Sequence, residues 1–175
     1  MATNVADKRV AERLTSAIYR PLFLLTSRRR DGPYGKIVLS ALSIFFSNPV
    51  KFVLVLEKSD PMHEAVAESG VFALHALRPD QADLARKFMA GVALGATGVS
   101  GVDYRAGHTG CPVLSDCLGY IEMEVLGKLD ASSHTLFVNE VRDARSHVSI
   151  EDLGYGAGVY EQWLTNKVLA PDSTA

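Results

Sequence analysis

The chain has 175 residues, of which 47% are hydrophobic and 22% are charged, so its composition is that of a folded domain and argues against disorder. Its 18 Lys and Arg residues nearly balance 20 Asp and Glu residues, a formal net charge of −2 that disfavours bulk electrostatic binding to nucleic acid. Because no apolar run reaches the ~20 residues of a membrane span, and no signal-peptide core is present at the start, we expect a cytoplasmic protein with no membrane partner.

The first part of the chain predicts a helical arm followed by two strands. Over residues 1–20, apolar side chains recur at helical spacing until Pro21 ends the pattern. Leu22–Ser27 is expected to be a strand, and the turn signal Asp31–Pro33 joins it to a second strand over Gly35–Phe46. That second strand is apolar on both faces, which predicts burial of both, the second by barrel closure or by a subunit interface.

The next segments predict a strand, a helix and another strand. Phe52–Glu57 is an apolar run of strand length. Asp60 is a favourable N-cap, Pro61 suits the first helical position, and Gly70 is the expected end of that helix. Val71–Leu77 then forms a strand.

The remaining segments add two helices and further strands. Pro79 opens a short helix, and the glycine-rich stretch Gly91–Gly110 is expected to be a long loop of the kind that often has a function. Thr135–Arg142 predicts a strand, and Tyr160–Val168 predicts a terminal amphipathic helix.

Cys117–Gly127 has the clearest alternation in the chain. Ile121, Met123 and Val125 point to one face and Glu122 and Glu124 to the other, so we expect a half-exposed strand with both glutamates in solvent. Five to seven strands that are not separated by regular helices disfavour a doubly wound parallel sheet. The fold class predicted is mainly β, an antiparallel barrel with peripheral helices.

Several short segments, in this order and spacing, carry a resemblance to a known family. They are Lys58-Ser59, Met62–Val66, Ser69–Phe72, Gln81–Phe88, Gly107–Leu114, which follows the pattern G-x-T-G-x-P-x-L, and Ser133–Val138. Through them the chain resembles the flavin reductase-like family, whose members adopt an FMN-binding split β-barrel of Greek-key type. The match runs from about Pro21 to Tyr160, so we divide the chain into an arm over residues 1–20 and a split-barrel domain over residues 21–170.

The resemblance implies an NAD(P)H-dependent flavin reductase. Such a protein would be a homodimer with FMN or FAD at the subunit interface, would use NADH or NADPH as co-substrate, and would supply reduced flavin to an oxygenase partner. Two alternatives stay open: a barrel that holds flavin or another planar ligand without turnover, and a structural dimer with an empty pocket. The choice between FMN and FAD, and between NADH and NADPH, is left open as well.

The residues that the resemblance places around the flavin differ in part from the family pattern. Ile37 and Leu39 stand where the family usually has Thr and Ser, and with fewer hydroxyls the site would bind flavin weakly, take it as a diffusible substrate, or have lost it. A cation and a hydroxyl before a helix N-terminus also suit a phosphate, although an exposed lysine beside an ordinary cap explains the same residues. The predicted cofactor-binding residues are Lys36, Ile37, Leu39, Ser40, Ser43, Lys58, Ser59 and Phe88.

Among the histidines, His134 is the catalytic candidate. Its side chain would orient nicotinamide or relay a proton, and the alternative is a hairpin histidine bonded to the main chain. His75 lies on an apolar strand face and is expected to be a satisfied core residue, whereas His63 and His108 are expected to be exposed. The histidines show no metal-ligand spacing, so we expect no metal. Cys111 and Cys117 fit no zinc or redox motif and are expected to be small packing residues.

Overall fold

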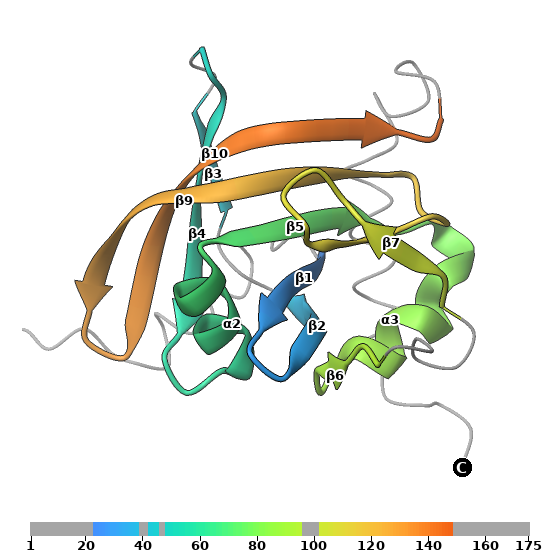
Figure 1. The fold of residues 1–175 in the computed structure, drawn as a ribbon, viewed down its shortest axis with the longest axis horizontal. Coiled ribbons are helices and arrows are strands. Elements are labelled where there is room, and N and C mark those ends of the chain that lie inside the picture. Colours follow the sequence, from blue (N-terminus) through green and yellow to red (C-terminus); the bar gives the residue numbers. More distant parts are fainter. Residues whose placement is uncertain (1–22, 39–41, 46–47, 96–101, 149–175) are drawn as a thin grey trace, which may run out of the picture.

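A computed structural model of the protein describes residues 23–38, 42–45, 48–95 and 102–148 (Figure 1). The predicted arm over residues 1–20, the terminal helix over Tyr160–Val168, and the site residues Leu39 and Ser40 lie outside these ranges. Among the described residues, no helix is long and apolar enough to cross a membrane.

Most described residues belong to one antiparallel sheet with the strand order β3-β4-β10-β9-β5-β1-β2-β6. Its strands are β1 (Phe23–Arg29), β2 (Gly32–Val38), β3 (Leu42–Phe45), β4 (Lys51–Glu57), β5 (Val71–Ala76), β6 (Val92–Ala93), β9 (Gly119–Ala131) and β10 (His134–Ser146). A separate pair is formed by β7 (Tyr104–Ala106) and β8 (Pro112–Leu114). The sheet ends at β3 and β6 without closing on itself, which confirms the predicted antiparallel split-barrel class.

The single long strand predicted over Gly35–Phe46 is wrong, because the structure divides it into two strands. β2 pairs with β1 near one end of the sheet order, whereas β3 pairs with β4 at the other end. The chain therefore passes from one end of the order to the other between Val38 and Leu42, and the apolar run reflects two strands in different surroundings.

Two short helices cover opposite faces of the sheet. Met62 and Val66 of α2 (Pro61–Ser69) pack in one core cluster with Leu25, whereas Phe88 of α3 (Ala82–Phe88) packs in the other with Leu24. A 3₁₀ turn, η1 (Pro79–Gln81), precedes α3. Because successive residues of β1 enter different clusters, the middle of the sheet is buried on both faces.

The ends of α2 follow the predicted capping signals. Asp60 Oδ1 accepts a hydrogen bond from the Met62 backbone N–H at 2.8 Å, and Pro61 occupies the first helical position. Gly70 ends the helix with φ 68°, a left-handed conformation that glycine adopts without steric penalty. Both boundaries confirm the prediction from sequence.

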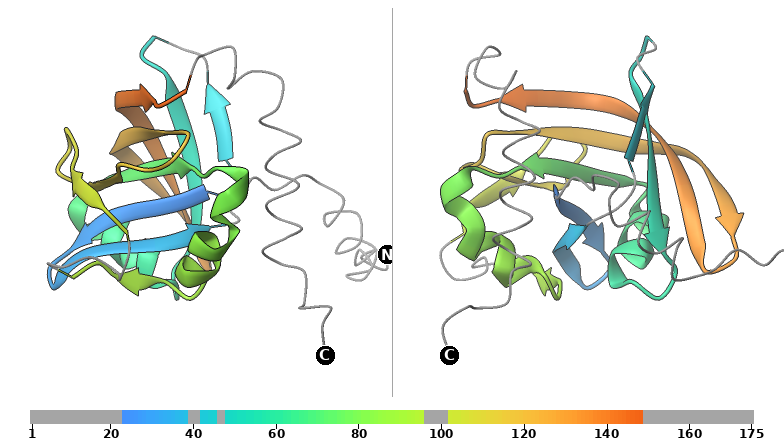
Figure 2. Two further views of the ribbon diagram at one scale, coloured as in Figure 1. Left: turned by 90° about the vertical axis from the view of Figure 1, so that its right-hand side faces the viewer. Right: turned by 180° about the vertical axis from the view of Figure 1, so that it is seen from behind.

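The strands β9 and β10 form a long hairpin that curves over the rest of the sheet and turns beside α2 (Figure 2). The pairing is interrupted by a bulge, because Val138 lies opposite Gly127 while the next residue, Asn139, lies opposite Val125. Leu126 is thus an extra residue in β9. A second irregularity lies between Val141 and Asp143.

The prediction that Glu122 faces solvent is wrong, because its side chain is fully buried. The loop before β8 folds over it: Glu122 Oε1 accepts the His108 backbone N–H at 2.8 Å, and Oε2 accepts the Thr109 backbone N–H at 2.7 Å and the Thr109 hydroxyl at 2.6 Å. A Cβ atom at Gly107 would overlap the carboxylate, so only glycine fits there without a shift. Within the described part of the glycine-rich stretch, the loop therefore encloses an acidic side chain of the sheet.

His75 is a satisfied core residue, as predicted. Its Nδ1 donates to the Leu24 carbonyl at 3.1 Å, and its Nε2 accepts the Leu114 backbone N–H at 3.2 Å. These two bonds require the neutral ring, and burial lowers the pKa of His75 to about 4. The residue joins β1, β5 and β8 in the interior.

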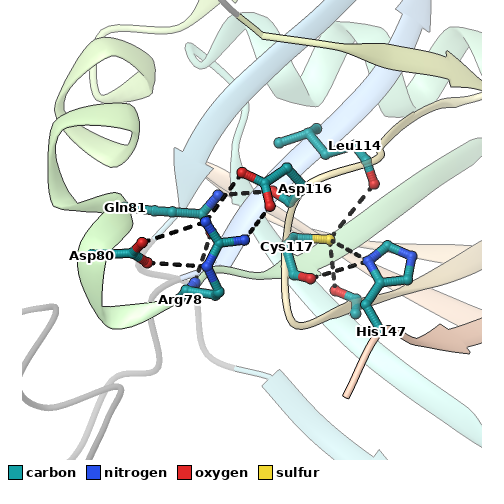
Figure 3. A network of polar contacts seen from close by, with 8 residues as sticks. Arg78, Asp80, Gln81, Leu114, Asp116, Cys117 and His147 are labelled. Atoms are coloured by element: carbon teal, nitrogen blue, oxygen red, sulfur yellow. Dashed lines mark hydrogen bonds and ion pairs between the residues drawn. The ribbon is translucent and has the colours of Figure 1, made fainter.

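A polar network joins η1 to the turn between β8 and β9 (Figure 3). Arg78 bonds the carboxylates of Asp116 and Asp80, and Gln81 Nε2 donates to the Asp116 carbonyl at 2.7 Å. The neighbouring Cys117 Sγ lies 3.8 Å from His147 Nδ1. Both cysteines are buried free thiols, which confirms their prediction as packing residues, and burial raises the pKa of each to about 11.

Candidate functional site

The turn between β9 and β10 lies against the loop between β4 and α2. The Lys58 backbone N–H donates to the Ser133 carbonyl at 2.8 Å, and the Lys58 ammonium group lies 2.5 Å from Asp130 Oδ2. In the register of the sheet, His134 is the partner of Glu57. The structure thus brings the predicted residues Lys58, Ser59 and His134 to one end of the molecule, beside α2 (Figure 1).

Lys36 reaches the same end of the molecule from β2. Its Nζ lies 2.6 Å from Asp60 Oδ2, and about one fifth of each side chain is exposed. Because the other oxygen of Asp60 caps α2, one carboxylate holds both the helix N-terminus and the lysine. Lys36 of β2 and the loop residues Lys58 and Ser59 therefore lie on either side of Asp60 at the start of α2.

An open hollow of about 450 Å³ runs along the side of α2 from this point. Its lining residues are Lys58, Ser59, Asp60, Pro61, His63, Glu64, Ala67 and Glu68. Two arginines at the end of β1 and in the turn after it pair with the far wall, Arg29 with Glu64 at 3.7 Å and Arg30 with Glu68 at 3.4 Å. The charges that border the hollow are therefore largely paired.

His63 is a residue of this site whose contacts the sequence did not reveal, and the expectation that it is exposed is wrong. It is half-buried, with Nε2 2.8 Å from the Thr135 hydroxyl and its ring centroid 5.4 Å from that of Phe137. Desolvation lowers the pKa of His63, and the positive charges of Lys58 and Lys128 lower it further. Thr135 lies 72 residues away, so no local pattern signals this contact.

His134, by contrast, is exposed at the start of β10. Its Nδ1 lies 2.9 Å from the Ser133 hydroxyl, and no bond from its ring to the main chain is present among the described residues. Its side chain is therefore open to solvent, on the side of β10 opposite Thr135. Its catalytic role stays a prediction.

Other predicted site residues lie elsewhere. Ile37 is 4% exposed and Phe88 is fully buried, and both pack in the cluster of Leu24 on the α3 face. Phe88 lies so close to Gly35 that a Cβ atom there would meet the ring. Ser43 is in β3, opposite Val53 of β4. Ile37 and Phe88 are thus enclosed in the interior of this single chain, and their flavin contacts stay predictions.

Known proteins are similar to this chain over most of its length. A ferric-chelate reductase (NAD(P)H) of Archaeoglobus fulgidus is 30% identical over 136 residues, which are 77% of this chain and 80% of that protein. The reductase component of a 4-nitrophenol 4-monooxygenase/4-nitrocatechol 2-monooxygenase of Rhodococcus opacus is 28% identical over 70% of this chain and 64% of that one. The chain spans half the length of a further curated relative.

Solved structures share the fold. The NADH:FAD oxidoreductase SgcE6 of Streptomyces globisporus C-1027 superposes with a TM-score of 0.66 at 21% identity, over 83% of this chain and 87% of that one. Residues 15–164 match the family model of the flavin reductase like domain. The chain therefore belongs to the flavin reductase-like domain family.

Proposed function

We propose that the protein is an NAD(P)H-dependent flavin reductase that takes FMN or FAD at the end of the molecule beside α2. The observation that carries this proposal is that Lys36, Lys58 and Ser59 lie beside Asp60 at the start of α2, with His134 at the neighbouring end of β10. Family membership and the names of the relatives support the reaction. A flavin, when bound, accepts a hydride from NADH or NADPH.

The residues at this end of the molecule have the chemistry that a flavin tail needs. Lys58 supplies a cation and Ser59 a hydroxyl, and both residues line the hollow beside the first turn of α2. Lys36 would approach the tail from β2. In our proposal His134 orients the nicotinamide carboxamide by a hydrogen bond or moves a proton at its ring nitrogen. Leu39, Ser40 and Ser43 are further proposed flavin contacts, whereas Ile37 and Phe88 pack in the interior on the α3 face and could contact only a flavin that reaches that face.

The test of the reaction is a spectrum of the purified protein and an assay of NADH and NADPH oxidation with and without added FMN or FAD. We expect oxidation, followed at 340 nm as is usual for reduced nicotinamide, only when flavin is present. Flavin binding without oxidation of either nicotinamide would instead support the non-catalytic ligand-binding barrel. If neither binding nor oxidation occurs with either flavin, the proposed function is refuted.

Replacing His134 with Ala is expected to slow hydride transfer by about tenfold or more while flavin affinity stays close to that of the wild type. The loss of one oriented hydrogen bond in the transition state accounts for a change of this size. Single-turnover reduction of bound flavin by NADH, followed by stopped-flow absorbance, measures the rate. His108→Ala is the matched control, because His108 is an exposed histidine in the loop before β8, where only its backbone bonds Glu122. Equal rates for wild type and His134→Ala would remove the role given to His134.

We further propose a homodimer. An apolar hollow of about 490 Å³ on the sheet supports it, because the part of the sheet that lines it is left open by α2 and α3. The hollow is lined by Phe23, Phe52, Leu74, Ala76, Gly119, Tyr120, Ile121, Ala144, Arg145 and Ser146. Sedimentation equilibrium is expected to give twice the 18.9 kDa of one chain. A mass of one chain at micromolar concentration would contradict the dimer.

An oxygenase is the partner that we propose for the reduced flavin, since the Rhodococcus opacus relative is by name the reductase component of a monooxygenase. Such a role requires that reduced flavin leave the protein. We expect flavin to behave as a second substrate, with a saturable dependence of the NADH oxidation rate on its concentration. A rate independent of added flavin would indicate a retained cofactor and argue against transfer to a partner.

A further inference from the structure

Each of the two lysines in the proposed flavin site is held by a carboxylate. Lys36 Nζ lies 2.6 Å from Asp60 Oδ2, and Lys58 Nζ lies 2.5 Å from Asp130 Oδ2. The hydrogen bond and charge of Lys58 also hold the pKa of Asp130 below its usual value, so this carboxylate is ionised at neutral pH. Two cations that could receive an anionic ligand are thus already paired within the protein.

The helix N-terminus is likewise occupied. Asp60 Oδ1 accepts the Met62 backbone N–H, which is one of the groups that an anion at the start of α2 would use. Beyond it, Glu64 and Glu68 add two carboxylates to the lining of the hollow, and these pair with Arg29 and Arg30. A terminal phosphate, with a charge of about −1.5 to −2 at neutral pH, would meet two lysines whose charges are already neutralised by the neighbouring Asp60 and Asp130 carboxylates.

Building on the proposed function, we propose that Asp60 and Asp130 set the flavin selectivity of this protein by cancelling the advantage of a terminal phosphate. A flavin tail that ends in a hydroxyl loses nothing to these carboxylates, because it has no charge to be repelled and needs no free cation. The site is therefore expected to take riboflavin nearly as well as FMN. The ring and the ribityl chain would supply most of the affinity for either flavin.

The experiment compares Kd values for FMN and riboflavin, measured by quenching of flavin fluorescence, in the wild type and in Asp60→Asn and Asp130→Asn. In the wild type we expect the two constants to agree within about threefold. Asp60→Asn keeps a good N-cap, because asparagine caps helices as well as aspartate does. It is expected to tighten FMN binding by about three- to tenfold and to leave riboflavin binding unchanged, as removal of a like charge near the phosphate requires. Asp130→Asn is expected to act in the same direction but less, because Asp130 is exposed and screened by salt.

The matched control is Asp83→Asn, which removes the same charge from an exposed pair with Arg86 on α3, on the other face of the sheet. It is expected to change neither constant, and thermal unfolding followed by circular dichroism checks that all three variants are folded. The inference is overturned if wild-type FMN binds more than about thirtyfold tighter than riboflavin, or if the Asp60 and Asp130 variants shift both flavins equally. A protein that binds neither flavin overturns the proposed function and this inference with it, whereas the other two results overturn the inference alone.

Discussion

Replacing Glu122 with Ala is expected to lower the free energy of unfolding by about 3–5 kcal/mol, because it leaves buried donors without an acceptor. The donors are the backbone N–H groups of His108 and Thr109 and the Thr109 hydroxyl, all of which bond the Glu122 carboxylate. The substitution also opens a cavity in a fully buried position. Urea denaturation followed by far-ultraviolet circular dichroism measures the change at pH 7.

The control for this prediction is Glu124→Ala on the same strand. Glu124 pairs with Arg142 at 2.7 Å at the surface, where about half of its side chain is exposed, so its loss is expected to change stability by less than ~1 kcal/mol. Similar effects of the two substitutions would mean that the Glu122 carboxylate does not hold the loop over the sheet. The variant Glu122→Gln keeps an acceptor oxygen and the side-chain volume. Its loss of unfolding free energy is therefore expected to lie between those of Glu122→Ala and Glu124→Ala.

The second large effect is a loss of stability between pH 6.5 and pH 4 that arises from His75. Burial lowers its pKa from 6.5 to about 4 in the folded protein, so between these values the unfolded chain binds a proton that the folded protein excludes. Stability from this residue is complete above pH 6.5 and is lost as the pH falls toward 4. The loss is expected to be about 2 kcal/mol at pH 5 and about 3 kcal/mol at pH 4.

Urea denaturation at pH 7.5, 6, 5 and 4 measures this dependence, and the variant His75→Gln isolates it. The variant is expected to be less stable at pH 7.5, because it loses the bonds to Leu24 and Leu114. As the pH falls, however, its free energy of unfolding is expected to decrease less than that of the wild type, by the losses given above for His75. Carboxylates titrate in both proteins, so their contribution cancels in the difference. If the two proteins have parallel pH profiles, His75 does not titrate as inferred.

Local chemistry explains why parts of the fold were predictable. The start and end of α2 depend on Asp60, Pro61 and Gly70, which act on their own neighbours in the chain, and the structure has both boundaries as expected. The burial of His75 followed from its place on an apolar strand face. These inferences required no knowledge of distant contacts.

Predictions failed where a distant segment decides the environment of a residue. Alternation along β9 correctly separates Glu122 from Met123, but it does not show that the loop at Gly107–Gly110 covers the glutamate. Similarly, the apolar run over Gly35–Phe46 gives no sign that its two halves pair with different strands.

The same holds at the candidate site. The resemblance pointed to Lys58 and His134. The register of β4 and β10 places His134 opposite Glu57, the residue before Lys58. The resemblance did not reveal Asp130 or Thr135 as partners of Lys58 and His63, because each pair is 72 residues apart in the chain. Charge pairing of this kind is visible only in three dimensions.

The bulge at Leu126 determines which side chain of the hairpin meets Lys58. Val125 packs against the core, and counting by twos from it would place Leu129 on the α2 side of the strand. The extra residue reverses this order, so that Asp130 shares that side with its register partner Thr135. In a hairpin without the extra residue Leu126, Leu129 rather than Asp130 would lie on the α2 side. The Lys58 ammonium group would then lose the carboxylate with which it pairs. Relatives should therefore be compared by strand register across this hairpin, since a gap of a single position there changes which side chain lies beside Lys58.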